Sequence, residues 1–207
     1  MSLTKLEAVN MVLDAIGESP VSSLTSGLPD AEAAEAKLDE VRVEILSRGW
    51  HQDIEKDVTL KRDANNEILL SNIYLRVDST GGDKDVNVVQ RYSNGKRKLF
   101  NLSKRQYTFD KDLVVDLIID IPFDELTVEL QNYIAARAAR KFQESALGSS
   151  SLDSFTVRAE AEAWAGLQDA EAENEDNNII KSSPHRSEEH TSELQSRQYL
   201  VCRLLLE

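Results

Sequence analysis

Apolar residues recur at helical spacing near the start of the chain. Thr4 and Glu7 form a T-x-x-E capping pattern ahead of an apolar stripe. Gly17 and then Pro20 follow the stripe, and both residue types favour the end of a helix. The stripe itself consists of Leu6, Val9, Leu13 and Ile16. This pattern predicts a first helix over about residues 4–16.

A second helix is predicted over about residues 30–48. Gly49 would end it, with Trp50 just beyond. One side of this segment carries small and aliphatic residues at helical spacing, namely Ala31, Ala34, Leu38, Val41, Ile45 and Leu46.

The pattern changes to β structure between residues 51 and 122. Short β-branched or alternating runs predict strands at 57–60, 67–70, 86–92, 98–101, 107–109 and 113–119. Asn94-Gly95 is a strong hairpin signal, and Ala64–Asn66 reads as a turn between the first two strands. Gly81–Asp83 reads as a flexible loop, and the apolar run at 113–119 as a strand buried on both faces. Five to six short strands predict a small sandwich or barrel-like sheet.

Helical spacing returns after Ile121-Pro122 and predicts helices over about 125–147 and 154–173. Gly148 and the serines at 149–151 would form the connection, and the acidic stretch from Asn174 is expected to fray. The first of these helices would bury Leu126, Leu130, Tyr133, Ile134, Ala138 and Phe142. The second would bury Phe155, Ala159, Ala163, Leu167 and Ala170.

These elements predict an α+β fold, an antiparallel helical bundle with an inserted small antiparallel β domain. Residues 1–50 and 123–180 would form a discontinuous helical domain, and 51–122 the insertion. Residues 181–207 are expected to be a disordered tail. Back-translation of 186–207 can produce the constant parts of a common short-read sequencing adapter, so we exclude this segment from fold reasoning as an artefact.

Composition narrows the classes of function. The formal net charge is −13, which disfavours tight binding of nucleic acid, because phosphate contacts need clustered Lys and Arg. The single cysteine, Cys202, lies in the excluded tail, so a disulfide or a cysteine-ligated zinc site is not expected. The sequence shows neither a signal peptide nor an apolar run of membrane-spanning length. Synthesis and assembly in the cytoplasm are therefore expected.

Candidate catalytic and metal-binding residues are weak. His51 has no nucleophile pattern beside it, and we interpret it as a surface residue. The alternating carboxylates Asp110, Asp112, Asp116 and Asp120 lack the spacing of a calcium loop, and we interpret them as a solvated strand face. No catalytic residue, metal site or cofactor is predicted.

Two basic clusters stand out in this acidic chain. Lys96, Arg97 and Lys98 follow the predicted hairpin turn, where they form either a solvated turn or a contact with an acidic neighbouring subunit or passing DNA. The stripe of Arg137, Arg140 and Lys141 is expected to pair with an acidic helix such as that at 32–44.

The ordered combination of helix, I-G-E-x-P-V-S-S-L loop (16–24), helix and S-R-G-W (47–50) resembles the tail tubular protein A family. These proteins are head-to-tail adaptors of short-tailed bacteriophages. The resemblance extends to about Ile180. The residues that carry it are Gly17, Glu18, Pro20, Arg48, Gly49, Trp50, Ala138, Arg140 and Phe142. After Trp50 this chain departs from the family, with Gln52 and Asp53 where Phe and Asn are common.

The resemblance implies a structural protein of the virion tail and not an enzyme. Twelve-fold self-assembly into a ring is implied, with a portal protein above and the nozzle, tail tubular protein B, below. Double-stranded DNA would pass through as cargo, and no membrane would be involved. Two alternatives remain open, a tail-associated enzyme that cleaves polysaccharide and an interaction module outside any virion.

Overall fold

The computed structural model describes residues 2–146 and 150–182, with side chains over 2–146 and 156–174. The predicted disordered tail, 181–207, is wrong at residues 181–182, which belong to the last helix. The rest of that tail, including its adapter-like segment, and the predicted connection at Gly148 and Ser149 lie outside the described residues. Residues up to Leu167 form one compact unit, and the last helix continues from Gln168 in a second unit.

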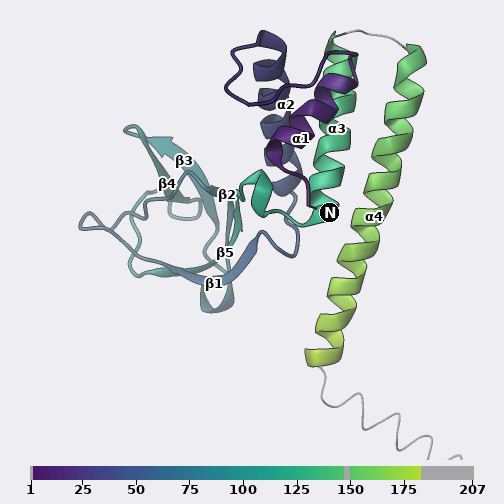
Figure 1. Ribbon diagram of the computed structural model, residues 1–207. Coiled ribbons are helices and arrows are strands. Elements are labelled where there is room, and N and C mark those ends of the chain that lie inside the picture. Colours follow the sequence, from purple (N-terminus) through teal and green to yellow (C-terminus); the bar gives the residue numbers. More distant parts are fainter. Residues whose placement is uncertain (1, 147–149, 183–207) are drawn as a thin grey trace, which may run out of the picture. The chain divides into compact units, whose positions relative to one another are not determined.

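Four helices and five strands confirm the predicted α+β class (Figure 1). The helices are α1 (Lys5–Asp14), α2 (Pro29–Leu46), α3 (Val128–Ala146) and α4 (Ser150–Ser182). Helices α1, α2 and α3 contact one another in all three pairings. The predicted division into a discontinuous helical domain and an inserted β domain stays a prediction.

Helix α1 begins and ends as its sequence predicts. The Thr4 side chain accepts the Glu7 N–H while Glu7 accepts the Thr4 N–H, which completes the capping box. At the other end, Gly17 has a φ of +80°, its N–H donates to the Asp14 carbonyl, and the Glu18 N–H donates to the Leu13 carbonyl. These two bonds form a Schellman motif, so Gly17 satisfies carbonyl groups that the helix end would leave unpaired.

A second glycine with positive φ follows the end of α2, but here a side chain also caps the carbonyl groups of the helix end. Gly49 has a φ of +82°, and its N–H donates to the Leu46 carbonyl at 2.9 Å. The Ile45 carbonyl accepts from the Trp50 indole Nε1 at 2.8 Å, and the Trp50 backbone N–H donates to Asp53. Trp50 therefore caps α2 and also fixes the direction in which the chain leaves the helix.

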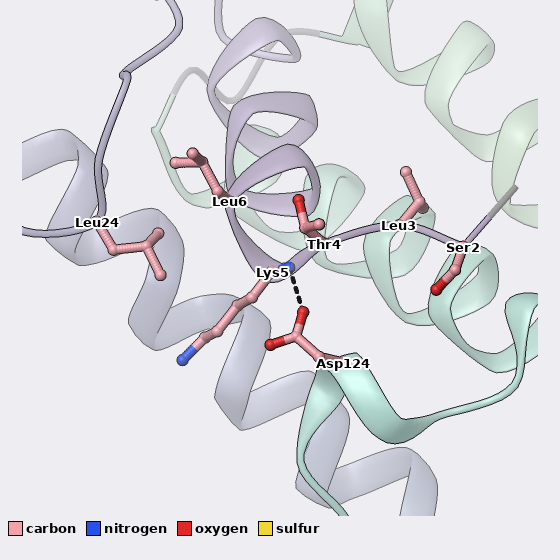
Figure 2. Close-up of a pocket in the computed structure, with 7 residues that line it drawn as sticks. All are labelled: Ser2, Leu3, Thr4, Lys5, Leu6, Leu24 and Asp124. Carbon is pink, nitrogen blue, oxygen red and sulfur yellow. Dashed lines mark hydrogen bonds between the residues drawn. The ribbon is translucent and has the colours of Figure 1, made fainter.

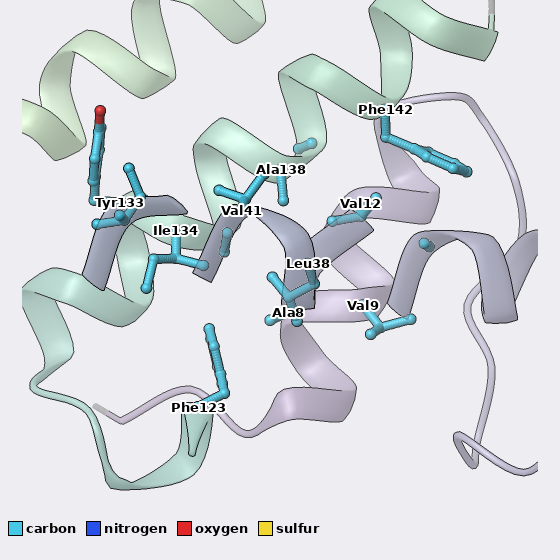
Figure 3. Packing of buried hydrophobic residues seen from close by; sticks show 14 of the residues in the cluster. Ala8, Val9, Val12, Leu38, Val41, Phe123, Tyr133, Ile134, Ala138 and Phe142 are labelled. Carbon is cyan, nitrogen blue, oxygen red and sulfur yellow. The ribbon is translucent and has the colours of Figure 1, made fainter. Parts of the chain in front are cut away.

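The helices share a hydrophobic core (Figure 3). On α2 all six residues predicted to be buried are buried. On α1 the buried residues are Ala8, Val9, Val12 and Leu13. The predicted members Leu6 and Ile16 are only half-buried: Leu6 lies at the edge of this buried face, and Ile16 lies beyond the last helical residue, Asp14.

Helix α3 begins at Val128, three residues later than predicted. A 3-10 turn, η2 (Phe123–Glu125), precedes it. The Gln52 side chain accepts the Thr127 N–H at 3.0 Å and so provides a partner just before the helix begins. All six residues predicted to face inward here are buried.

The strands form two sheets, one of three strands and one of two. They are β1 (Ile54–Leu60), β2 (Tyr74–Ser79), β3 (Val88–Ser93), β4 (Lys96–Asn101) and β5 (Leu113–Ile119). The first sheet has the order β1-β5-β2 and the second pairs β3 with β4, all antiparallel. Side chains from both sheets share one apolar cluster that includes Leu60, Val77, Leu99 and Val115.

Several strand predictions need correction. The segments 67–70 and 107–109 make only isolated bridges, because residues 67–70 divide their pairing between Thr108 and Lys98 of β4. Strand β2 was not predicted. Residues 113–119 alternate between buried and half-buried positions and are not buried on both faces, although β5 is the central strand.

The expected loop at Gly81–Asp83 is an ordered 3-10 turn, η1. Asp83 is buried, with 4% of its surface exposed; it accepts the Val114 N–H and forms an ion pair with Lys111. The Lys111 ammonium and the Val114 N–H lower the pKa of Asp83 below its usual value. The turn is therefore held against β5.

Helix α4 is longer than predicted and presents a different face. It extends beyond both predicted ends, to Ser150 and Ser182, because its many alanines and acidic residues are compatible with helix throughout. Leu167 is buried as expected, and Ala163 is half-buried, but Ala159 is exposed. Glu160 and Trp164 occupy the inner face instead. The side chain of Phe155 lies outside the described part of the chain.

We predict that Gly49→Ala destabilises the protein more than Gly17→Ala does. Both glycines have positive φ, so each substitution costs about 1–2 kcal/mol for backbone strain alone. A Cβ at position 49 would lie 2.9 Å from the Ile118 Cδ1 atom, whereas a Cβ at position 17 would meet nothing within 4 Å. Urea denaturation of the two variants measures the difference, and equal losses of unfolding free energy would contradict the contact.

Candidate assembly surfaces

The described residues contain no group of acidic, histidine or cysteine side chains suited to holding a metal ion. His51 is exposed. None of the helices in the described ranges is sufficiently long and apolar to span a bilayer. The candidate sites in the described residues are therefore surfaces, hollows and charge clusters.

The alternating carboxylates near β5 each have a partner. Asp112 accepts the Arg62 N–H at 3.1 Å, and Asp116 accepts the Asp57 N–H at 2.9 Å. Lys104 pairs with Asp110 and lowers the pKa of that carboxyl. Arg42 of α2 pairs with Asp120. Asp110 and Asp112 are exposed, as expected of a solvated face, whereas Asp116 and Asp120 are half-buried. These groups also link loops, strands and a helix, which the prediction of a solvated strand face did not include.

A hollow of about 400 Å³ lies at the start of α1 (Figure 2). Leu3, Leu6 and Leu24 line it, and Asp124 accepts the Lys5 N–H at 2.7 Å. The Lys5 ammonium pairs with Glu35 at 2.7 Å and with Asp39 at 2.9 Å. Partial burial opposes a raised pKa for Lys5, but these two carboxylates outweigh it and raise that pKa. These charges are thus paired within the subunit. The hydrogen bond from Lys5 to Asp124 connects the start of α1 to η2 at this hollow.

Three aromatic rings connect α4 to the rest of the bundle. The ring of Trp164 lies 4.9 Å from that of Tyr133 and 5.9 Å, edge to face, from that of Trp50. The Arg48 guanidinium lies 6.0 Å from the Trp164 ring. The S-R-G-W motif therefore ends α2 and also contacts α4. Trp164 was not among the predicted core residues.

A charge network joins three helices beside these rings. Arg137 of α3 pairs with Glu44 of α2 at 2.8 Å and with Glu160 of α4 at 2.7 Å. Lys141 also pairs with Glu44, and Arg140 pairs with Glu160. The predicted pairing of this basic stripe with α2 is confirmed at Glu44. Burial opposes a raised pKa for Arg137, but the two carboxylates raise it nonetheless.

The other family-motif residues lie in two places. Glu18 and Pro20 are exposed in the loop after α1. Ala138 and Phe142 are buried in the bundle core, where they pack against α1 and α2. Gln52 and Asp53, where the chain departs from the family pattern, take part in capping α3 and in holding Trp50. The departure is thus accommodated by hydrogen bonds.

The predicted basic cluster at the β3–β4 hairpin divides into internal and exposed members. Lys98 is buried and pairs with Glu67 at 2.5 Å. Arg97 is half-buried and donates to the carbonyls of Asn72 and Tyr74. Lys96 is exposed. An intermolecular role for this cluster stays a prediction, and Lys96 is the member whose side chain is most accessible.

A second hollow, of about 370 Å³, lies beside this hairpin. Leu69, Tyr92, Lys96 and Arg97 are among the residues that line it. Tyr92 is 72% exposed, more than any other large apolar residue in the described ranges. Tyr92 was not predicted as a site residue, although one signal was available: residues 86–109 contain six basic residues and no acidic residue.

We predict that Trp164→Ala lowers the unfolding free energy by about 2 kcal/mol, because α4 loses its ring contacts. The loss is smaller than for a fully buried tryptophan, since Trp164 is only half-buried. Trp164→Phe keeps a ring and should lose less than half as much. Chemical denaturation of both variants tests this. Equal losses would mean that the aromatic contacts contribute little to the docking of α4.

We predict that the stabilising effect of Glu44 depends on pH. Hydrogen bonds from Lys141 and Arg137 lower the pKa of Glu44 below 4.5 in the folded protein. Its contribution, about 1 kcal/mol for a partly exposed pair, is therefore complete above pH 4.5 and is lost as pH falls through the lower, folded-state pKa.

Urea unfolding of wild type and Glu44→Gln between pH 3 and 7 measures this contribution. The two proteins should differ at pH 7 and converge toward pH 3. Glu55→Gln, at an exposed residue of β1, is the matched control. A difference for Glu44→Gln that is independent of pH would contradict the prediction.

Comparisons with known proteins agree with this architecture. The family model described as "Tail tubular protein" matches residues 6–177. The chain is also 26% identical over 134 residues to tail tubular protein A of Klebsiella phage KP34, covering 64% of this chain and 68% of that protein. The family match spans α1 to α4 and includes the β strands. The chain therefore belongs to the tail tubular protein family, whose members are structural components of bacteriophage tails.

Proposed function

We propose that this protein forms a ring adaptor between the portal and the tail nozzle and extends the channel through which DNA leaves the head. The observation that carries the proposal is the family match across the helices and the β region together. The partners of the proposed adaptor are other copies of this chain, in a dodecamer, with the portal protein and tail tubular protein B. Its location is the virion tail, after assembly in the host cytoplasm.

The surface chemistry of the chain supports an assembly role. Exposed large apolar residues occur on several separate elements, at Met11, Leu28, Val43, Leu69, Ile73, Tyr92, Leu102 and Val157. Singly dispersed apolar residues are common on protein surfaces, so the charge of the surface is the more informative feature. The net charge of −13 suits a channel wall along which double-stranded DNA passes without adhering.

In the proposed function no residue performs covalent chemistry. The hollow at the start of α1 is lined by leucines and by charged groups that are paired within the subunit. The helices would build the ring, and the β region, as an inserted domain, would reach neighbouring proteins. Heterologous contacts between copies would close the ring by rotation.

We predict that the full chain joins its cognate portal as a multimer of about a dozen copies, as expected for a closed ring. Light scattering of the chain alone, of the portal alone and of their mixture measures the stoichiometry. Bovine serum albumin, also acidic, serves as a control for non-specific charge effects. A chain that stays monomeric with the portal would contradict the adaptor proposal.

The same preparation tests the rival functions. Release of reducing sugar from host surface polysaccharide would support a tail-associated enzyme, and an inert monomer would support an interaction module outside the virion. Neither result is expected under the adaptor proposal.

A further inference from the structure

The hollow beside the β3–β4 hairpin, defined here by Leu69, Tyr92, Lys96 and Arg97, combines apolar surface with positive charge. Leu69 is 41% exposed and Tyr92 is 72% exposed. Arg97 bonds to two carbonyl groups and to the Gln90 side-chain oxygen, all of them neutral. No carboxylate within the described ranges pairs with either Arg97 or Lys96.

Most basic residues in the described ranges pair with a carboxylate, among them Lys5, Arg42 and Arg137. Lys96 and Arg97 belong to the minority that do not. The chain has 37 acidic and 24 basic residues, yet none of the acidic ones lies between residues 86 and 109. A half-buried guanidinium whose partners are neutral favours an incoming carboxylate. The hollow therefore suits a ligand with an apolar group beside negative charge.

Helix α1 presents a surface of this kind. Glu7, Met11 and Asp14 are exposed and follow the spacing i, i+4 and i+7, so they share one face of the helix. Met11 is 42% exposed, and its flexible thioether side chain adapts to irregular hollows. On this face the apolar side chain of Met11 therefore lies between the two carboxylates.

Asp14 is also poorly placed for the stability of its own helix. It occupies the last turn of α1, where the helix dipole disfavours negative charge, and that turn has no basic residue. Its side chain forms no ion pair within the described part of the molecule. A contact outside the subunit would give this carboxylate a favourable role.

We propose that the hairpin hollow of one copy binds the Glu7–Met11–Asp14 face of a second copy, with Met11 entering between Leu69 and Tyr92 and Asp14 facing Lys96. The two surfaces differ, so the contact is heterologous and repeats from copy to copy, as a ring requires. This inference rests on the proposed adaptor function and names the surfaces through which copies of the chain meet.

Charge reversal in the full chain tests the contact. Lys96→Glu and Asp14→Lys should each weaken self-association, measured on the portal by light scattering, by about tenfold. The double variant should regain most of the loss, because the reversed charges attract again. Asp14→Lys should not lower the melting temperature of the subunit, since a basic residue suits the end of α1.

The chain offers a matched pair of control positions. Lys84 and Asp85 are both exposed and lie outside both surfaces, so Lys84→Glu and Asp85→Lys change the net charge equally and should leave association unchanged. Weakening by the controls as large as by the test variants would overturn the inference in favour of a general charge effect.

Cross-linking adds a test of which surfaces meet. Two chains are made in a Cys202→Ser background, one with Met11→Cys and the other with Tyr92→Cys. Oxidation of their equal mixture should link up to about half of the assembled chains as disulfide heterodimers, the maximum for random incorporation. Each chain alone should produce little. A disulfide requires Cα atoms within about 7 Å, so a distant pair would not cross-link.

The outcomes separate this inference from the proposed function. Wild type that never assembles with the portal contradicts both. Wild type that assembles while the charge-reversed variants assemble equally well, and while the cysteine pair stays reduced, leaves the adaptor function supported and overturns the contact proposed here.

Discussion

The end of α2 is the point on which the rest of the structure depends. Gly49 adopts a positive φ, and Trp50 then caps the helix with its indole N–H while its ring contacts that of Trp164. Beyond it, the Asp53 carbonyl accepts the Ile119 N–H of β5, and the Gln52 side chain accepts the Thr127 N–H before α3. The five consecutive residues 49–53 thus link α2 to the central strand, to α3 and to α4.

The contact between Gly49 and Ile118 explains why these connections need a glycine here. Any side chain at position 49 would press on Ile118 of the three-stranded sheet. Nearby, Arg42 pairs with Asp120 and donates to the Ile121 carbonyl at 2.6 Å. The helical bundle and the three-stranded sheet therefore meet at two points. One is the close packing of Gly49 against Ile118, and the other is the Arg42–Asp120 ion pair.

Strong local patterns were predictable from the sequence, and long-range partners were not. The capping box, the Gly17 helix end and the buried face of α2 follow from spacing alone, because each depends on residues within two turns. The face of α4 was predicted only in part, because alanines occur on all sides of it and Trp164 finds its partners just beyond the end of α2 and on α3. Strand β2 was missed because it is an edge strand with polar residues, such as Arg76 and Asp78, that hide the alternation. The internal role of Lys98 depends on Glu67, which lies 31 positions away in the chain.

Helix α4 differs from the other helices in what makes it helical. Its 33 residues are rich in alanine and acidic side chains, and it is stabilised partly by local pairs such as Arg158–Glu162. In the described part of the chain only Leu167 of α4 is a fully buried apolar residue, whereas α1, α2 and α3 bury many. Its helicity is thus largely intrinsic, while its position depends on a few aromatic and ionic contacts. A helix of this kind keeps its conformation through local interactions, so loss of its few contacts with the bundle would change where it packs more than whether it is helical.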